Sequence, residues 1–137
     1  MPDLDRTRAL APLLLAKART DLAMARIVLD RGEDLEPWAA VFHAQQAGEK
    51  ALKSMLIAEG IDPPHTHDLE DLRGLLPAAS QVGASGPDIQ RLNKFSAAVR
   101  YVMRFQEVPD PTWAEAEAAV AVAIRIVDAV TAQIRGK

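Results

Sequence analysis

Apolar residues recur at intervals of three and four along most of the chain, which is the spacing of one face of an α-helix. At the start of the chain they are Leu14, Ala18, Leu22, Ala25 and Leu29. This spacing predicts a first helix over residues 12–31. Gly32 is the residue expected just past its end, because glycine adopts the left-handed conformation that commonly closes a helix.

The next two segments are bounded by proline and glycine. Pro37 suits the first turn of a second helix, where its missing N–H costs nothing. This helix is predicted to run to residue 59, before Gly60 and the Pro63-Pro64 pair. A third, short helix is predicted to begin near Thr66 or Asp68, both acceptable N-caps, and to stop before residue 77.

A loop rich in serine and glycine follows over residues 78–86, and Pro87 opens a fourth predicted helix that extends to about Phe105. Two prolines then frame a turn. Thr112 and Glu115 form the pattern of a capping box, in which each side chain accepts a hydrogen bond from the other residue's backbone N–H. The last helix is predicted to fill the rest of the chain.

No stretch alternates at period two and no internal repeat is present, so we expect no strand. The prediction is an all-α fold: a five-helix up-and-down bundle of four long helices and one short one, forming a single domain over residues 1–137. Hydrophobic residues make up 49% of the chain but aromatic residues only 4%. Small aliphatic side chains must therefore build the core, which favours closely packed helices.

Composition excludes several classes of function. The net charge of −3 gives no general attraction to nucleic acid or membranes, so such contacts would need a local patch. The absence of cysteine excludes disulfides and thiol chemistry. The acidic N-terminus does not resemble a signal peptide, and no apolar run approaches the ~20 residues of a membrane span. We therefore expect a cytoplasmic protein.

The second helix has two contrasting faces. One face holds apolar and small residues, at positions 41, 44, 47, 48, 51, 52 and 55, which would let a neighbouring helix approach closely. The opposite arc holds Phe42, His43, Gln46, Glu49, Lys50 and Lys53. On spacing alone this arc is a solvated surface, with Glu49 and Lys53 forming an exposed pair worth only ~0.2–0.5 kcal/mol.

Residues 42–53, FHAQQAGEKALK, resemble the second-helix motif of HEPN domains (higher eukaryotes and prokaryotes nucleotide-binding). Two further matches follow in the order seen in that family: Thr66-His67-Asp68-Leu69 at the start of a short helix, and Arg100-Tyr101 on the fourth helix. The resemblance spans nearly the whole chain and implies the same five-helix layout.

Many HEPN proteins are metal-independent ribonucleases, in which an Arg is followed four to six residues later by a His. No histidine follows Arg100 or Arg104 in this chain. The resemblance therefore favours the non-catalytic members, which are often encoded beside a minimal nucleotidyltransferase. The chain has no glycine-rich phosphate loop and no paired-Asp motif, so it would need a partner for nucleotidyl transfer. We expect it to lack enzymatic activity and cofactors.

The resemblance implies a phosphate-binding cleft between the second and fourth helices. The expected phosphate-binding residues are Arg100, Arg104, Lys50 and Lys53. Residues expected to line the cleft or to orient those side chains are Gln46, Glu49, Tyr101, His67 and Asp68, with Glu49 beside Arg100. A metal site at His65, His67 and Asp68 is disfavoured because no further ligand is evident. His67 or Asp68 is instead expected to cap the third helix.

Three functional hypotheses follow. In the first, the chain is a homodimeric nucleotide- or RNA-binding module and the partner of a nucleotidyltransferase, in a system of the toxin–antitoxin kind. In the second, it is a divergent ribonuclease in which His43 or His67 replaces the missing histidine. In the third, it is a structural or inhibitory module that docks an apolar helix face onto another protein.

Overall fold

The computed structural model describes residues 4–94 and 110–136, and within them every regular element is helical. The elements are α1 (Leu4–Arg8), α2 (Leu10–Arg31), the 3-10 turn η1 (Gly32–Asp34), α3 (Pro37–Ala58), α4 (Leu69–Leu75), α5 (Gly86–Asn93) and α7 (Trp113–Arg135). The predicted all-α fold is confirmed. Each of the five predicted segments corresponds to a helix, whereas α1 was not predicted. The part of the fourth predicted helix beyond residue 94 lies outside the described residues.

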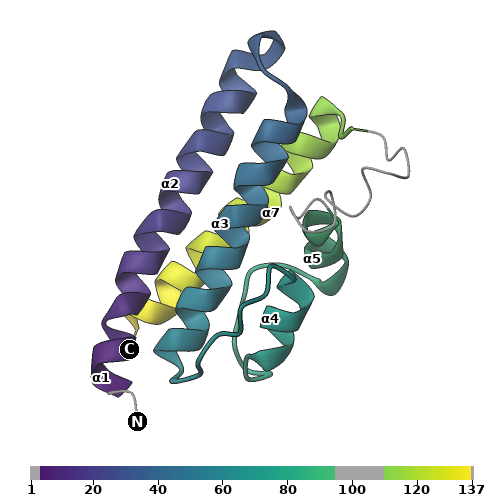
Figure 1. Cartoon of the computed structure of the whole chain (residues 1–137). Helices are drawn as coiled ribbons and strands as arrows, with labels where there is room; N and C mark the ends of the chain where they lie inside the picture. Colours follow the sequence, from purple (N-terminus) through teal and green to yellow (C-terminus); the bar gives the residue numbers. More distant parts are fainter. Residues whose placement is uncertain (1–3, 95–109, 137) are drawn as a thin grey trace.

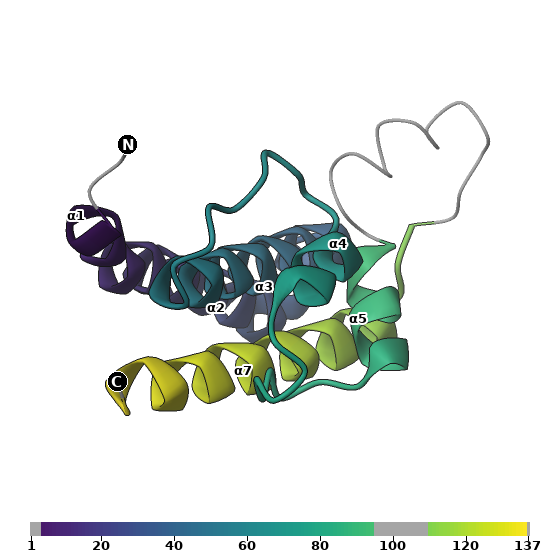
Figure 2. The same ribbon diagram turned by 90° about the horizontal axis from the view of Figure 1, so that it is seen from below.

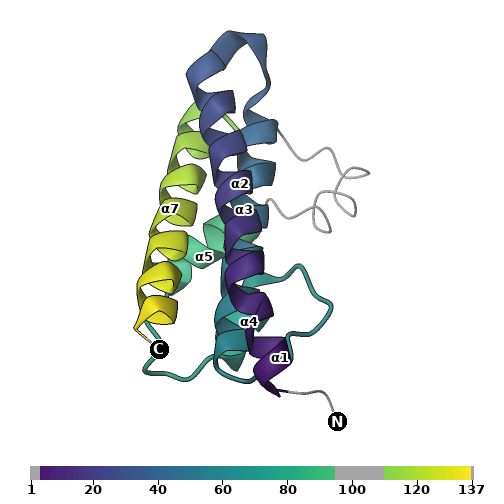
Figure 3. The same cartoon turned by 90° about the vertical axis from the view of Figure 1, so that its left-hand side faces the viewer.

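The three long helices lie side by side (Figure 1). α2 and α3 are antiparallel neighbours joined by the short η1 turn, and α7 packs against both, running in the same direction as α3. α4 and α5 cover one flank, where α4 packs on α3 and α5 bridges α3 and α7 (Figure 2). α1 and the C-terminal end of α7 lie at the same end of the bundle (Figure 3).

Small side chains build much of the core, as the composition predicted. Fully buried alanines occur on α2, α3 and α7, at Ala18, Ala25, Ala40, Ala44, Ala47, Ala51, Ala116 and Ala123. The larger core residues include Leu52, Leu56 and Ile126 on the long helices, and Leu72 and Leu92 from α4 and α5. Because each alanine keeps the helix axes close, the larger side chains can interdigitate at the density of a protein interior.

Local signals fix where the helices begin and end. Gly32 closes α2 with φ of +57°, and Pro37 occupies the first turn of α3. Asp68 caps α4, since its Oδ1 accepts from the backbone N–H groups of Glu70 and Asp71 at 2.9 and 3.2 Å. The predicted capping box at the start of α7 is present as well. None of the described helices has the length and apolar character needed to cross a membrane.

Candidate functional site

Gly48 brings the middle of α3 close to three other helices. A Cβ at this position would lie 3.2 Å from the Leu92 side chain and 3.7 Å from those of Ile126 and Leu69. This contact confirms the prediction that the small-residue face of α3 allows close approach. It also turns the opposite arc of the helix, with its lysines, away from α5 and α7.

A carboxylate from α2 organises one half of that polar arc. Asp21 is buried, and its Oδ1 lies 3.0 Å from the Nδ1 atom of His43. Its Oδ2 accepts a hydrogen bond from the Lys50 ammonium, two turns beyond His43 on the same side of α3. The side chains of His43 and Lys50 remain about a quarter exposed. The buried carboxylate of Asp21 therefore fixes the positions of the His43 and Lys50 side chains at the surface.

A second carboxylate, on α3 itself, organises the other half. Glu49 is buried, and its Oε2 accepts a hydrogen bond from Lys53 at 3.2 Å. Its Oε1 lies 2.8 Å from the Nδ1 atom of His67, which belongs to the segment before α4. The interpretation of Glu49 and Lys53 as an exposed pair is thus wrong for the carboxylate, because the close approach of the loop at His67 covers it.

The paired glutamines of the motif anchor this loop. Gln45 is fully buried, and its Nε2 donates to the backbone oxygen of His67 at 3.0 Å. Its Oε1 accepts from Nε2 of Gln46 at 3.0 Å. Both polar ends of a buried side chain are therefore satisfied. The loop is held against α3 at the position that places the imidazole of His67 beside Glu49.

The structure gives Asp68 a structural role. Besides capping α4, its Oδ1 accepts from Nδ2 of Asn93 at 3.1 Å, while Oδ1 of Asn93 accepts from the Leu69 backbone N–H at 2.7 Å. Asp68 thus ties the start of α4 to the end of α5, which confirms the capping prediction. Across residues 4–94 and 110–136, no group of three or more potential His, Cys, Asp or Glu ligands is placed to hold a metal ion.

The polar face of α3, meaning His43, Gln46, Glu49, Lys50 and Lys53 together with Asp21 and His67, is the candidate site. Of the predicted site residues it unites Gln46, Glu49, Lys50, Lys53 and His67. Arg100, Tyr101 and Arg104 lie outside the described residues, as does the expected contact between Glu49 and Arg100. Sequence reasoning missed Asp21. Its signal was a lone carboxylate between Ala18, Leu22 and Ala25 on the buried stripe of α2.

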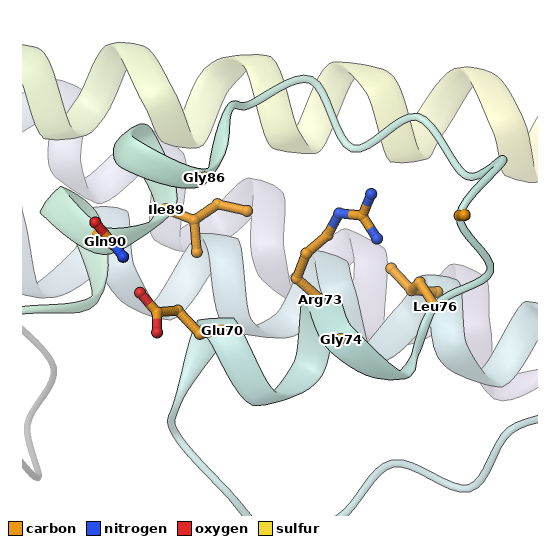
Figure 4. A pocket seen from close by; sticks show the side chains of 8 residues that line it. Glu70, Arg73, Gly74, Leu76, Gly86, Ile89 and Gln90 are labelled. Atoms are coloured by element: carbon orange, nitrogen blue, oxygen red, sulfur yellow. The ribbon is translucent and has the colours of Figure 1, made fainter.

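Two of the cavities lined by described residues flank α5. One, of about 460 Å³, opens between α4 and α5, where Glu70, Arg73 and Gln90 stand around the apolar side chains of Leu76 and Ile89 (Figure 4). The other, of about 500 Å³, lies between α5 and α7, with Arg91, Lys94 and Arg125 among its lining residues. Neither of these two cavities includes a residue of the polar face of α3.

Known protein families and solved structures include relatives of this chain. The model of the HEPN domain family matches residues 11–133. The chain belongs to the HEPN family. The structure resembles that of TT1696 from Thermus thermophilus, at 29% identity and a TM-score of 0.75, covering 90% of this chain and 98% of that one.

An archaeal HEPN homologue, ST0689, is similar at 27% identity and a TM-score of 0.69, covering 90% of this chain and 97% of that one. A search of curated proteins finds no match. The family is thereby established on both the sequence and the fold.

Proposed function

We propose that this HEPN protein binds the phosphate groups of a nucleotide or RNA through the polar face of α3, as the binding partner of a nucleotidyltransferase. The observation that carries the proposal is the paired arrangement of Lys50 and Lys53. Each ammonium is held at the surface by a buried carboxylate, Asp21 or Glu49. Two cations fixed along one side of α3 suit a ligand with a chain of phosphates.

Each lysine keeps donors for a ligand. An ammonium group has three N–H donors, and in this structure one is directed at the carboxylate of Asp21 or Glu49. The side chains of Lys50 and Lys53 are 28% and 18% exposed. Because the carboxylates limit the rotamers of the two lysines in advance, a phosphate that binds them would lose less side-chain entropy than it would with free lysines.

Within the polar face the charges of the two lysines are balanced by the two carboxylates. Further positive charge is needed for tight phosphate binding, and the sequence offers it at Arg100 and Arg104, which lie outside the described residues. We therefore expect the two arginines to supply the net attraction, while the polar face of α3 fixes the position of the ligand.

Binding would be tested by fluorescence anisotropy with labelled ATP and with a short labelled single-stranded RNA. We expect Lys50→Gln and Lys53→Gln each to weaken binding by about tenfold, the effect of losing ~1.4 kcal/mol, and Arg100→Ala to weaken it at least as much. Arg26→Gln removes the same charge as the lysine variants from an exposed position of α2 and should bind as wild type does. Equal binding by all variants, or none by wild type, would contradict the proposal.

The partner is a separate part of the proposal. We place the protein in the cytoplasm as a homodimer that associates with a nucleotidyltransferase, in an arrangement of the toxin–antitoxin kind. The first test is whether the adjacent gene encodes such an enzyme. Co-expression should then yield a complex that survives size-exclusion chromatography, and separate elution of the two proteins would contradict the partnership.

One observation favours a second function, a divergent ribonuclease. His43 and His67 each direct Nδ1 at a buried carboxylate, at 3.0 and 2.8 Å. A carboxylate in that position orients an imidazole so that its Nε2 atom is available for proton transfer. Incubation of RNA with wild type, His43→Gln, His67→Gln and Arg100→Ala would decide. Cleavage that one histidine variant abolishes supports this function, and the absence of cleavage by wild type rejects it.

A further inference from the structure

The cavity between α4 and α5 has polar side chains around an apolar centre. Its volume of about 460 Å³ lies in the range of sites that hold a small molecule. The side chains that define it come from α4, from the segment that follows α4 and from α5: Glu70, Arg73, Leu76, Ala78, Ile89 and Gln90. None of them belongs to the polar face of α3, so a ligand in this cavity would be held separately from the proposed phosphate site.

Glu70 and Arg73 give the cavity two ends of opposite charge. They lie three residues apart on α4, a spacing at which opposite charges commonly pair. Here neither side chain makes an ion pair or a hydrogen bond with the residues that the structure describes. Figure 4 shows the Glu70 carboxylate and Gln90 toward one end of the cavity and the Arg73 guanidinium toward the other. Both charged groups are therefore available to a ligand.

The surface between the two charged ends is apolar. In Figure 4 the Ile89 side chain lies between those of Glu70 and Arg73, and Leu76 lies beside Arg73. Ile89 and Leu76 are only 2% and 5% exposed, so they belong to the core and line the cavity with the little surface that remains. A ligand with apolar groups between its charged ends would remove this surface from water.

The walls of the cavity are fixed before any ligand binds. The start of α4 is tied to the end of α5, because Nδ2 of Asn93 donates to Asp68 and Oδ1 of Asn93 accepts from the Leu69 backbone N–H. Two glycines, Gly74 and Gly86, line the cavity without filling it, and a Cβ at either position would meet no atom within 4 Å. Binding would therefore cost little ordering of the protein.

We propose that this cavity binds a zwitterionic dipeptide with apolar side chains. Its carboxylate would accept two parallel hydrogen bonds from the Arg73 guanidinium, the geometry that guanidinium favours. Its ammonium would donate to the Glu70 carboxylate and to the amide oxygen of Gln90. A single amino acid is too short, since one carbon separates its charged groups whereas Ile89 separates the two ends of the cavity.

Charge separates this ligand from the ligand proposed for α3. Glu70 offsets the charge of Arg73, so the cavity has no net attraction for a polyanion such as a nucleotide, and its carboxylate repels phosphate groups. A ligand with one positive and one negative end matches both groups at once. The proposal does not depend on phosphate binding, and either can fail without the other.

The first test compares three forms of one dipeptide by isothermal titration calorimetry with the full chain. The forms are leucyl-leucine, leucyl-leucine amidated at its carboxylate, and leucyl-leucine acetylated at its amine. Removal of either charge should weaken binding about tenfold, which corresponds to ~1.4 kcal/mol. Failure of wild type to bind leucyl-leucine, or equal binding of the three forms, would overturn the proposal.

Two variants assign each charge of the ligand to its residue. Arg73→Gln should weaken binding of leucyl-leucine about tenfold but leave the amidated form unaffected, because that form has no carboxylate to lose its partner. Glu70→Gln should act in the same way on leucyl-leucine and the acetylated form. Arg91→Gln is the matched control, since it removes a charge beside Gln90 on α5 from a residue that does not line this cavity. Equal losses for the charged and modified forms would overturn the assignment.

A third variant tests the location. Gly74→Leu places a large side chain at a lining position where a Cβ has open space, and it should weaken binding of leucyl-leucine at least tenfold. Ala79→Leu adds a leucine at an exposed position that does not line this cavity and should bind as wild type does. Circular dichroism checks that each variant keeps its helices. Undiminished binding by a folded Gly74→Leu would place the ligand elsewhere and overturn the proposal.

Discussion

Two buried carboxylates, Asp21 and Glu49, each hold one lysine and one histidine. Burial of such groups brings a desolvation penalty that the ion pair only partly offsets. Apolar residues at these positions would pack α2 and α3 together at least as well. The arrangement is therefore better explained by what it does at the surface, where it fixes the positions of two ammonium groups and two imidazoles.

The residue types at this site could be recognised from the sequence, but their surroundings could not. The small residues of α3 predicted close helix packing, and Gly48 confirms it. Burial of Glu49 depends on the loop that Gln45 draws onto α3, a contact over 22 residues of sequence that no local pattern encodes. The same holds for Asp21, whose partners lie on another helix.

At Gly48 the structure predicts a steep dependence of stability on side-chain size. A methyl group gains ~1 kcal/mol of helix propensity but presses on Leu92, so Gly48→Ala should change the free energy of unfolding by less than ~1 kcal/mol. Gly48→Leu should lower it by ~1–3 kcal/mol because the space is already filled. Urea unfolding followed by circular dichroism measures both.

Gly74 is the matched control. It lies within α4, and a Cβ there would meet no atom within 4 Å. Gly74→Ala should therefore raise the free energy of unfolding by up to ~1 kcal/mol. Unchanged stability of Gly48→Leu would show that α3, α4 and α5 are not packed as described.

Helix boundaries are the best-predicted feature at the scale of elements, because caps are local. Gly32, Pro37, Asp68 and the Thr112 capping box all mark the ends that the sequence indicated. The capping box of Ser85 and Asp88 at the start of α5 was missed. There Gly86 and Pro87 stand between the two capping residues and resemble a turn, although proline is well tolerated in the first turn of a helix.

The capping box of α7 predicts a dependence of stability on pH. The Thr112 backbone N–H donates to Glu115, and this hydrogen bond, outweighing the effect of burial and aided by Lys94, lowers the pKa of the Glu115 carboxyl below its ordinary 4.5. Because the folded pKa is the lower one, the stabilisation is complete above about pH 4.5 and is lost as the pH falls through the folded pKa.

Wild type should therefore lose more stability than Glu115→Gln on acidification from about pH 5 to 3, since glutamine can accept the same hydrogen bond without titrating. Thermal unfolding at a series of pH values measures the difference. Parallel curves for the two proteins would mean that Glu115 makes no titratable contribution to the cap.

For the whole molecule, the sequence predicted the class of fold and the order of helices but not their arrangement. Apolar stripes identify which side of a helix is buried without identifying its neighbour. α7 packs on both α2 and α3, and this arrangement depends on how alanines and larger residues fit together across the three helices. Four large apolar residues of α2 that lie off its predicted apolar stripe are exposed, namely Leu10, Leu13, Met24 and Ile27.

One core shared by the three long helices predicts a single unfolding transition. Leu52 of α3 is fully buried in that core. Leu52→Ala should lower the free energy of unfolding by ~2–5 kcal/mol through lost contacts and a residual cavity. The unfolding transition followed by circular dichroism should shift together with that followed by the fluorescence of Trp38 and Trp113, which lie in the first turns of α3 and α7.

Leu75→Ala, at an exposed position of α4, should change stability by less than ~1 kcal/mol. Separate transitions for the fluorescence and circular dichroism signals would show that the helices form more than one cooperative unit.

Because α1 and the C-terminal end of α7 lie at one end of the bundle (Figures 1 and 3), the order of the helices along the chain can be changed without changing how they pack. A short linker between the ends would make a closed loop, which could be reopened at the exposed turn between α2 and α3, around Asp34. Such a circular permutant would keep the same helix contacts while α2 followed α7 in the chain. It would also move the attachment points for labels or surfaces to the opposite end of the molecule.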